Sequence, residues 1–245
     1  MKALVFAAGL GTRLKPLTDT MPKALVPIDG KPLLEHVLRK LIANGFDEII
    51  INVHHFADQI ISFLGENNNF GVRIAISDER DALLETGGGI KKASWFFDDG
   101  QPFLVHNVDI LSNIDLGKLY RYHLENRSLA TVVVSQRDTS RYLLFDDDLR
   151  LNGWTNIKTG EVKSPFETLD VSSYRRLAFS GIHVISPRMF ELMAGWNGKF
   201  SVIDFYLAVA SQAEIKGFVP ENLKMIDVGK IDSLHEAELF LNSSL

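Results

Sequence analysis

Hydrophobic and polar residues form two kinds of segment along the first half of the chain. Short apolar runs alternate with segments in which apolar residues recur at helical spacing. The runs expected to form strands are residues 2–8, 48–53, 72–77, 103–109 and 130–136. The segments with helical spacing are residues 33–44 and 115–125, with a weaker pattern at residues 58–64. This alternation predicts a βαβαβ first half and is typical of a sheet covered by helices on both faces.

The pattern changes from Arg141 onward. Residues 142–145 and 149–154 flank the acidic turn Asp146-Asp147-Asp148, which predicts a hairpin or two neighbouring edge strands. Residues 156–174 have the least regular pattern, and we expect exposed loops there, of the kind that can lie over a substrate cleft. The remaining elements expected are a strand at residues 177–186, a helix starting at Pro187, a helix at 201–212, a strand at 224–228 and a helix from Asp232.

Composition limits the class of protein. With 245 residues the chain can form one large α/β domain, and we expect a monomer or a small homo-oligomer. It has no cysteine, which excludes disulfides, thiolate zinc sites and a cysteine nucleophile, and is compatible with a reducing, cytoplasmic location. No apolar run approaches the roughly 20 residues that span a bilayer, so no membrane association is expected.

The charge balance makes nucleic acid an unexpected partner. The formal net charge is −5, from 26 basic and 31 acidic residues, and there is no long basic run. Anionic substrates would therefore have to be bound by a local cluster of positive groups, with the help of a metal ion.

A glycine-rich loop directly follows the first expected strand. It contains Ala8, Gly9, Gly11, Thr12 and Arg13. Glycines let the backbone turn tightly and present N–H groups to phosphate oxygens, and an arginine adds charged donors. A simple strand-to-helix turn is the alternative explanation, but the neighbouring cations favour phosphate binding.

Lys23 supplies a second cation ten residues after Arg13, and the preceding Pro22 restricts its backbone. Two better-known glycine motifs do not match. The dinucleotide fingerprint needs a third glycine where this chain has Leu14, and the Walker motif fails because Gly30-Lys31 is followed by Pro32.

Two aspartates end apolar runs. Asp109 follows residues 103–108, and Asp227 ends a shorter run. At the carboxyl edge of a sheet, two such carboxylates could hold Mg²⁺ together with phosphate oxygens and water. Either aspartate alone could instead be a helix cap or a turn former.

Several of these motifs together resemble the signature of sugar-1-phosphate nucleotidyltransferases. The matching segments, in chain order, are Ala7-Ala8-Gly9-Leu10-Gly11-Thr12-Arg13-Leu14, Pro16-Leu17-Thr18, Pro22-Lys23, Gly30-Lys31-Pro32-Leu33, Glu85-Thr86-Gly87-Gly88-Gly89-Ile90, Asn107-Val108-Asp109, Phe179-Ser180-Gly181-Ile182 and Ile226-Asp227-Val228-Gly229. Within the family, the Glu85-Thr86-Gly87-Gly88-Gly89 segment most resembles that of N-acetylmuramate 1-phosphate uridylyltransferases of cell-wall recycling, with sugar-1-phosphate guanylyltransferases close behind. The resemblance implies a Rossmann-like α/β/α sandwich with a mostly parallel sheet and a small inserted β region. We expect a single domain over residues 1–245, in which residues 1–110 bind the nucleotide and 111–245 the sugar.

The resemblance also implies roles for individual residues. Arg13 and Lys23 would be the catalytic cations, and Asp109 and Asp227 the ligands of Mg²⁺. Substrate contacts are implied for Ala8, Gly9, Gly11, Thr12, Glu85, Thr86, Gly87, Gly88, Asn107, Ser180 and Gly181. We expect the glycines at 87–89 to form a turn that opens a helix and lets the backbone approach the nucleobase. Ser180 and Gly181 would approach the sugar, although a mid-strand glycine is also often a bulge.

The expected reaction joins a nucleoside monophosphate from an NTP to a sugar 1-phosphate and releases pyrophosphate. UTP and N-acetylmuramate 1-phosphate are the first choice; the alternative is guanylyl transfer to mannose- or heptose-type 1-phosphates. Two departures from the family pattern, Val108 in place of glycine and Lys230 in place of threonine, leave open a regulatory protein that binds a nucleotide sugar without turnover.

Overall fold

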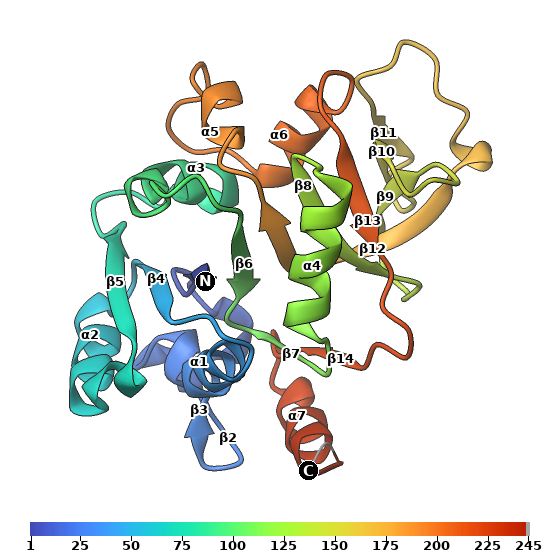
Figure 1. The fold of residues 1–245 in the computed structure, drawn as a ribbon. Coiled ribbons are helices and arrows are strands. Elements are labelled where there is room, and N and C mark those ends of the chain that lie inside the picture. The colour runs from blue at the N-terminus through green and yellow to red at the C-terminus, as the bar shows by residue number, and fades with distance from the viewer. Residues whose placement is uncertain (244–245) are drawn as a thin grey trace. The chain divides into compact units, whose positions relative to one another are not determined.

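The computed structural model describes residues 1–243 and divides into two compact units. Unit 1 consists of residues 1–83, 105–117 and 223–245, and unit 2 of residues 84–104 and 118–222. Each unit therefore contains segments that are far apart in the sequence. Figure 1 shows this by colour, because the red C-terminal helix α7 (Asp232–Ser243) belongs to the same unit as the blue N-terminal elements.

Unit 1 contains the expected βαβαβ arrangement. Strands β1 (Lys2–Phe6), β4 (Glu48–Val53) and β5 (Arg73–Asp78) pair in parallel, with Lys2 opposite Glu48 and Glu48 opposite Arg73. The crossover helices are α1 (Leu33–Ala43) and α2 (Ala57–Glu66). Helix α1 buries leucines and a valine at helical spacing, which is why its apolar stripe packs while its other face stays polar.

The remaining elements of unit 1 complete its core. Strand β7 (Ile110–Ser112) pairs antiparallel with β14 (Met225–Asp227), and β2 (Pro27–Ile28) with β3 (Lys31–Pro32). A buried cluster joins these elements to α7 and consists of Leu14, Val26, Ile28, Leu33, Leu111, Val228 and Ala237. The C-terminal segment is thus part of the same core as the loop that follows β1.

Unit 2 is organised around the long strand β12 (Arg175–Ile185). It pairs antiparallel with β8 (Ala130–Ser135), which pairs in parallel with β13 (Ile215–Phe218). It also pairs antiparallel with β9 (Arg141–Phe145), and β10 (Leu151–Asn156) and β11 (Glu161–Lys163) follow in order. The predicted hairpin is therefore confirmed, and strand pairing is mixed, with the antiparallel pairs concentrated in this inserted β region.

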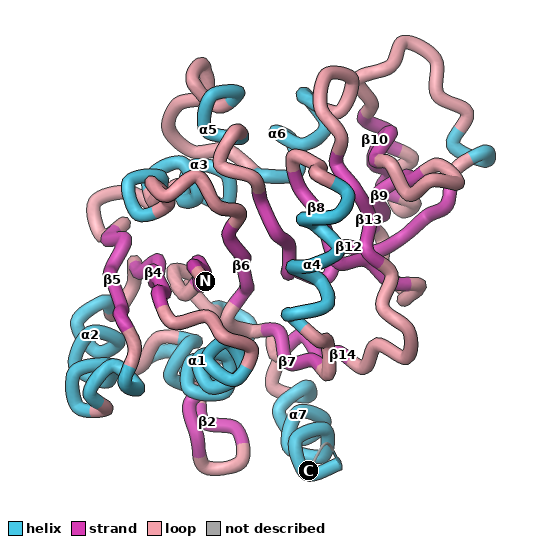
Figure 2. The backbone as a smooth tube through the Cα atoms, viewed as in Figure 1, coloured by secondary structure: helices cyan, strands magenta, loops and turns pink. Residues whose placement is uncertain are grey.

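Helices α3 (Glu85–Lys92), α5 (Met189–Leu192) and α6 (Val202–Val209) also belong to unit 2. The chain passes between the units within β6 (Phe103–Asn107) and within α4 (Leu116–Asn126). Short 3₁₀ turns are η1 (Thr12–Leu14), η2 (Leu17–Asp19), η3 (Lys23–Leu25), η4 (Asn68–Gly71), η5 (Ser94–Phe96) and η6 (Val171–Ser173). Figure 2 separates these helices and strands from the loops by colour.

Three sequence expectations need correction. The glycines at 87–89 lie inside α3 and do not form a turn before it. Residues 156–174 are not only loops, because β11 pairs with β10 and extends the hairpin. The helix expected from Pro187 begins at Met189 and is only one turn long. In the part of the chain that the structure describes, no helix combines the length and apolar character needed to cross a bilayer.

Candidate functional site

The loop after β1 is held in a tight conformation by Gly11. This residue has φ +63°, and its carbonyl oxygen accepts hydrogen bonds from Leu14 N (2.8 Å) and Thr18 Oγ1 (2.8 Å). A Cβ atom at this position would lie 2.9 Å from Thr18 Cγ2 and 3.0 Å from Lys23 Cβ. Only glycine therefore combines the required backbone angle with this close approach. At Gly9, by contrast, an added Cβ would meet nothing within 4 Å.

The side chains of Arg13 and Asp227 both lie next to Gly229. A Cβ added to Gly229 would be 2.7 Å from Arg13 Nη2 and 2.8 Å from Asp227 Oδ1. Both charged residues are exposed, whereas Leu14, next to Arg13 in the η1 turn, is fully buried. Burial of Leu14 fixes the turn and leaves the Arg13 guanidinium at the surface beside the Asp227 carboxylate.

Lys23 and Asp109 form an ion pair through Nζ and Oδ2. Their side chains are 9% and 23% exposed. Lys23 opens the η3 turn after Pro22, whose φ of −68° restricts the approach of the chain. Asp109 lies in the turn after β6, where its carbonyl oxygen accepts a hydrogen bond from Val228 N at 2.8 Å. As predicted, Asp109 thus lies just beyond the carboxyl end of a strand.

These contacts bring four charged residues of unit 1 together. Gly11 contacts Lys23, and Lys23 forms an ion pair with Asp109. The carbonyl oxygen of Asp109 accepts a hydrogen bond from the N–H of Val228, the residue after Asp227. The β7–β14 pairing places Asp227 opposite Ile110, directly after Asp109. The cluster combines two cations with two carboxylates, which suits an anionic ligand accompanied by a cation.

The two carboxylates fit Mg²⁺ in kind and number. Among the described residues no group of three or more His, Asp or Glu is placed to hold a metal ion. Mg²⁺ is commonly bound by one or two carboxylates plus phosphate oxygens and water, so Asp109 and Asp227 are a sufficient protein contribution. Lys23 already pairs with one oxygen of Asp109, so a metal ion held at these two aspartates would take further ligands from substrate and water.

Two buried polar residues behind the glycine loop were not anticipated from the sequence. Asn52, in β4, is 1% exposed, and its Oδ1 accepts a hydrogen bond from Ala8 N at 3.2 Å. Its Nδ2 donates to the carboxylate of Glu79, which is itself fully buried. Ala7 N also donates to the Asn52 carbonyl oxygen at 3.1 Å. The sequence signals only the position of Asn52, as one polar residue within the apolar run Ile49-Ile50-Ile51-Asn52-Val53, and it does not identify Ala8 or Glu79 as partners.

Further residues near Asp109 are mainly buried. His106 is 1% exposed; burial lowers its pKa to about 4, and its Nδ1 lies 2.8 Å from the Asn107 carbonyl oxygen. Asn107, a predicted substrate contact, is half-buried at the end of β6. Val108 is buried and donates its N–H to Phe6 O at 3.1 Å. Lys230 is exposed before α7, with its N–H 3.3 Å from Ser233 Oγ.

The glycines of α3 in unit 2 let two backbone segments approach each other. Gly87 N donates to Phe200 O at 2.9 Å, and a Cβ on Gly88 would lie 2.5 Å from the Gly198 oxygen. Thr86 Oγ1 accepts a hydrogen bond from Val202 N at 3.0 Å. Thr86, Gly87 and Gly88 thus pack against residues 198–202 of the same chain. The sequence did not reveal this packing role.

Ser180 and Gly181 lie at an irregularity of β12. The register with β8 shifts between Phe179 and His183, and Gly181 has φ +71°, so the glycine forms the bulge considered from the sequence. Ser180 is 1% exposed, and its Oγ is buried without a hydrogen-bond partner among the described residues. An unsatisfied buried hydroxyl is costly unless a bound group completes it.

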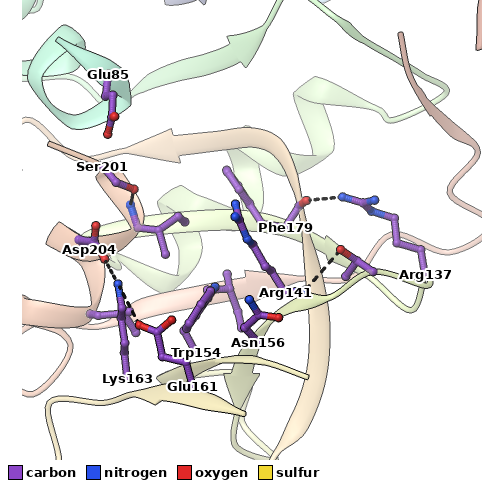
Figure 3. Close-up of a pocket in the computed structure, with 14 residues that line it drawn as sticks. Glu85, Arg137, Arg141, Trp154, Asn156, Glu161, Lys163, Phe179, Ser201 and Asp204 are labelled. Atoms are coloured by element: carbon purple, nitrogen blue, oxygen red, sulfur yellow. Dashed lines mark hydrogen bonds and ion pairs between the residues drawn. The ribbon is translucent and has the colours of Figure 1, made fainter. Parts of the chain in front are cut away.

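Unit 2 also contains a pocket of about 590 Å³ between the inserted β region and α6. Figure 3 shows Arg141, Trp154 and Asn156 from the hairpin on one side of it and Ser201 and Asp204 from the α6 segment on another. Its volume is within the range of small-molecule sites. Among the predicted site residues only Glu85 lines it, because the hairpin residues showed strand alternation but no recognisable motif.

Comparison with known proteins gives the family. A family model described as nucleotidyl transferase matches residues 2–244. The N-acetylmuramate α-1-phosphate uridylyltransferase of Caulobacter vibrioides is 34% identical over 91% of this chain and 90% of its own length. The protein of the same name from Neisseria meningitidis serogroup B is 34% identical over 97% of each chain.

A solved structure extends the comparison to the fold. The crystal structure of HddC from Yersinia pseudotuberculosis complexed with GMP-PN is 26% identical, with a TM-score of 0.76 over 98% of this chain and 99% of that one. The expected Rossmann-like α/β fold with an inserted β region is therefore confirmed. The motifs of the glycine loop and the two aspartates, the fold and the full-length sequence matches agree: the chain belongs to the nucleotidyl transferase family, as its resemblance to sugar-1-phosphate nucleotidyltransferases indicated.

Proposed function

We propose that this protein transfers a nucleoside monophosphate from an NTP to a sugar 1-phosphate, forming a nucleotide sugar and pyrophosphate. UTP and N-acetylmuramate 1-phosphate are the first choice of substrates, as in the named activity of the relatives from Caulobacter and Neisseria. The observation that supports this most strongly is the gathering of Arg13, Lys23, Asp109 and Asp227 in unit 1. Nucleotide contacts are assigned mainly to residues 1–110 and sugar contacts to residues 111–245.

The proposed chemistry needs little acid–base assistance. A phosphate oxygen of the sugar phosphate, ionised at neutral pH, attacks the α-phosphorus of the NTP. The bond to the bridging oxygen of the β-phosphate breaks, and pyrophosphate leaves with that electron pair. Alignment and charge stabilisation then supply most of the catalysis.

Each charged residue has a part in this scheme. Arg13, exposed on the η1 turn, binds the β- and γ-phosphates and the departing pyrophosphate. Lys23 neutralises negative charge at the α-phosphate and the incoming phosphate. Asp109 and Asp227 would hold Mg²⁺, which when bound supplies positive charge to the reacting phosphates.

The remaining predicted contacts come from backbone and small side chains. In the loop after β1, Ala8, Gly9, Gly11 and Thr12 present N–H groups to phosphate oxygens. Asn107 contacts the nucleotide or the sugar at the end of β6. In unit 2, Glu85, Thr86, Gly87 and Gly88 serve the nucleobase, and Ser180 and Gly181 the sugar. The unpartnered Ser180 hydroxyl supports a ligand contact at that position.

One alternative is guanylyl transfer to a mannose- or heptose-type 1-phosphate. It is favoured by the likeness to the HddC structure, which is a complex with GMP-PN. Another is a nucleotide-sugar-binding regulatory protein, suggested by Val108 and Lys230. Burial of Val108 against the sheet and exposure of Lys230 argue against either side chain obstructing the four charged residues.

Pyrophosphate release tests these alternatives. The protein is incubated with Mg²⁺, each of five NTPs and a panel of sugar 1-phosphates that includes N-acetylmuramate and mannose 1-phosphates. Release with UTP and N-acetylmuramate 1-phosphate would confirm the first choice, and release only with GTP and a mannose- or heptose-type 1-phosphate would confirm the alternative. Asp109→Asn should abolish release while UTP binding stays measurable. Tight UTP binding without release from any pair would favour the regulatory protein.

We place the reaction in the cytoplasm, in cell-wall recycling.

A further inference from the structure

The pocket in unit 2 is lined by three acidic and three basic residues, but its ion pairs within the described chain do not involve the two arginines among them. All three acidic residues that line it are already paired with lysines. Lys163 Nζ lies 3.1 Å from Asp204 Oδ1 and 3.9 Å from Glu161 Oε1, and Lys199 Nζ lies 3.3 Å from Glu85 Oε1. Each carboxylate of the pocket therefore pairs with a lysine, with Lys163 shared by two of them, and none pairs with an arginine of the pocket.

Two arginines of the same pocket lack a carboxylate partner among the described residues. Arg137 Nη2 donates to the carbonyl oxygen of Phe179 at 3.1 Å, which satisfies one donor without neutralising the charge. Arg141 uses its backbone N–H to reach Thr139 Oγ1 at 3.4 Å, and its guanidinium forms no ion pair in the described part of the chain. Figure 3 shows this guanidinium extending in among the pocket residues. An anionic group of a ligand could supply the ion-pair partner of this guanidinium.

The sheet determines where Arg141 points. Arg141 is opposite Asn156 in the β9–β10 register, and it shares a strand face with Leu143, two residues on. Trp154 is on the matching face of β10, and Lys163 lies 5.3 Å above its ring. Apolar surface from Trp154, Leu143 and Phe179 next to a forked cation suits a sugar ring that carries a carboxylate.

We infer that Arg141 is a specificity-determining residue that binds a carboxylate on the sugar, so that the preferred substrates are acidic sugar 1-phosphates. This inference rests on the proposed function. N-acetylmuramate 1-phosphate has such a group, the carboxylate of its lactyl ether, and N-acetylglucosamine 1-phosphate is the same sugar without it. The two compounds share the phosphate, and they therefore distinguish binding of the carboxylate from binding of the phosphate.

The test compares these two substrates in wild type, Arg141→Gln and Arg141→Lys, with UTP and Mg²⁺. We expect Arg141→Gln to lower kcat/KM for N-acetylmuramate 1-phosphate roughly 10- to 100-fold, the usual effect of losing a charge-assisted hydrogen bond. The value for N-acetylglucosamine 1-phosphate should not change, so the preference of the wild type should disappear. Arg141→Lys should recover part of it, because lysine keeps the charge but loses the fork. Arg121→Gln, on α4 and outside the pocket lining, is the matched control.

Equal losses for both sugars would overturn the inference and assign Arg141 to the phosphate, and no loss for either would also overturn it. In both cases turnover by the wild type still supports the proposed function. Calorimetric titration of each sugar 1-phosphate into wild type and Arg141→Gln gives a second readout. If the wild type has no turnover, the proposed function fails, while a selective loss of N-acetylmuramate 1-phosphate affinity would still support the carboxylate contact.

Discussion

Lys23 and Asp109 form a largely buried ion pair although 86 residues separate them in the sequence. The pair joins the turn after the glycine loop to the end of β6. Before substrate binds, the positive charge of Lys23 is therefore balanced by the carboxylate of Asp109. Lys23 could exchange this carboxylate for a phosphate oxygen of the substrate, and Asp109 would then be available as a ligand of Mg²⁺.

Lys23→Ala should therefore reduce both stability and activity. The Asp109 carboxylate would lose its partner where it is only 23% exposed, and we expect a cost of about 2 kcal/mol in the free energy of unfolding. In the proposed mechanism kcat should fall by at least about 100-fold. Urea unfolding and pyrophosphate release measure the two effects. Lys15→Ala is the control, because the Lys15–Asp19 pair (2.9 Å) is exposed and should contribute under about 1 kcal/mol. Equal effects of the two variants would contradict the prediction.

Asn52→Ala should loosen the glycine loop. The variant leaves Ala8 N–H and the buried Glu79 carboxylate without their shared partner, at a cost of about 2–3 kcal/mol in stability. Because Ala8 is at the start of the proposed phosphate-binding loop, KM for the NTP should rise as well. Asn67→Ala removes a comparable amide, but one that bonds to Phe63 O at an exposed helix end, and should cost under about 1 kcal/mol. A KM for the NTP that matches the wild type would show that the loop does not need this support.

Two glycine-to-alanine substitutions in helices should have opposite signs. Gly65→Ala in α2 meets nothing within 4 Å and should stabilise by roughly 0.5–1 kcal/mol, since alanine has the higher helix propensity. Gly88→Ala in α3 places Cβ 2.5 Å from the backbone oxygen of Gly198 and should destabilise by about 1–3 kcal/mol. Thermal unfolding of both variants checks this, and stabilisation by both would show that α3 can move away from residues 198–200.

The stability of the protein should fall below neutral pH because of His123. Burial lowers the pKa of this residue to about 4, and its Nδ1 lies 2.9 Å from Thr131 Oγ1. The unfolded chain takes up the proton near pH 6.5, well before the folded protein does, so acid favours unfolding between about pH 6.5 and 4. The loss from this residue between pH 7.5 and 5.5 should be about 1 kcal/mol.

Urea unfolding at the two pH values tests the effect. His123→Gln should unfold more easily at pH 7.5 but show a smaller pH dependence than the wild type. His235→Gln replaces an exposed histidine of α7 and serves as the control. The same pH dependence in wild type and His123→Gln would refute the assignment to His123. His106, whose pKa is also about 4, should account for part of the dependence that remains.

Local patterns were sufficient to predict the first half of the fold. The parallel strands β1, β4 and β5 and the helices between them have strong periodicity, and each element is specified by its own residues. The placement of Asp109 after a strand was also predictable, because an aspartate that ends a buried apolar run projects at a strand edge. Gly11 was identified as a turn residue, but its contacts with Thr18 and Lys23 depend on where the chain returns.

Features that depend on distant packing were missed. Gly87 and Gly88 were expected to form a turn because glycine disfavours helices, yet contact with residues 198–200 overrides this propensity. The Asn52–Glu79 hydrogen bond and the pocket around Arg141 combine residues that are far apart in the sequence. No local motif indicates such pairings, because a single polar residue in a strand reads only as a weak interruption.

The split of unit 1 among three segments has a consequence for how the protein is made. Asp227, β14 and the packing residues of α7 belong to this unit but are synthesised only after all of unit 2. On the ribosome, the apolar surface of Val26, Ile28 and Leu33 therefore stays exposed until Val228 and Ala237, which pack against it, have emerged. Nascent chains that stall before residue 223 should accordingly be candidates for chaperone binding, and they would lack one of the two aspartates on which the proposed reaction depends.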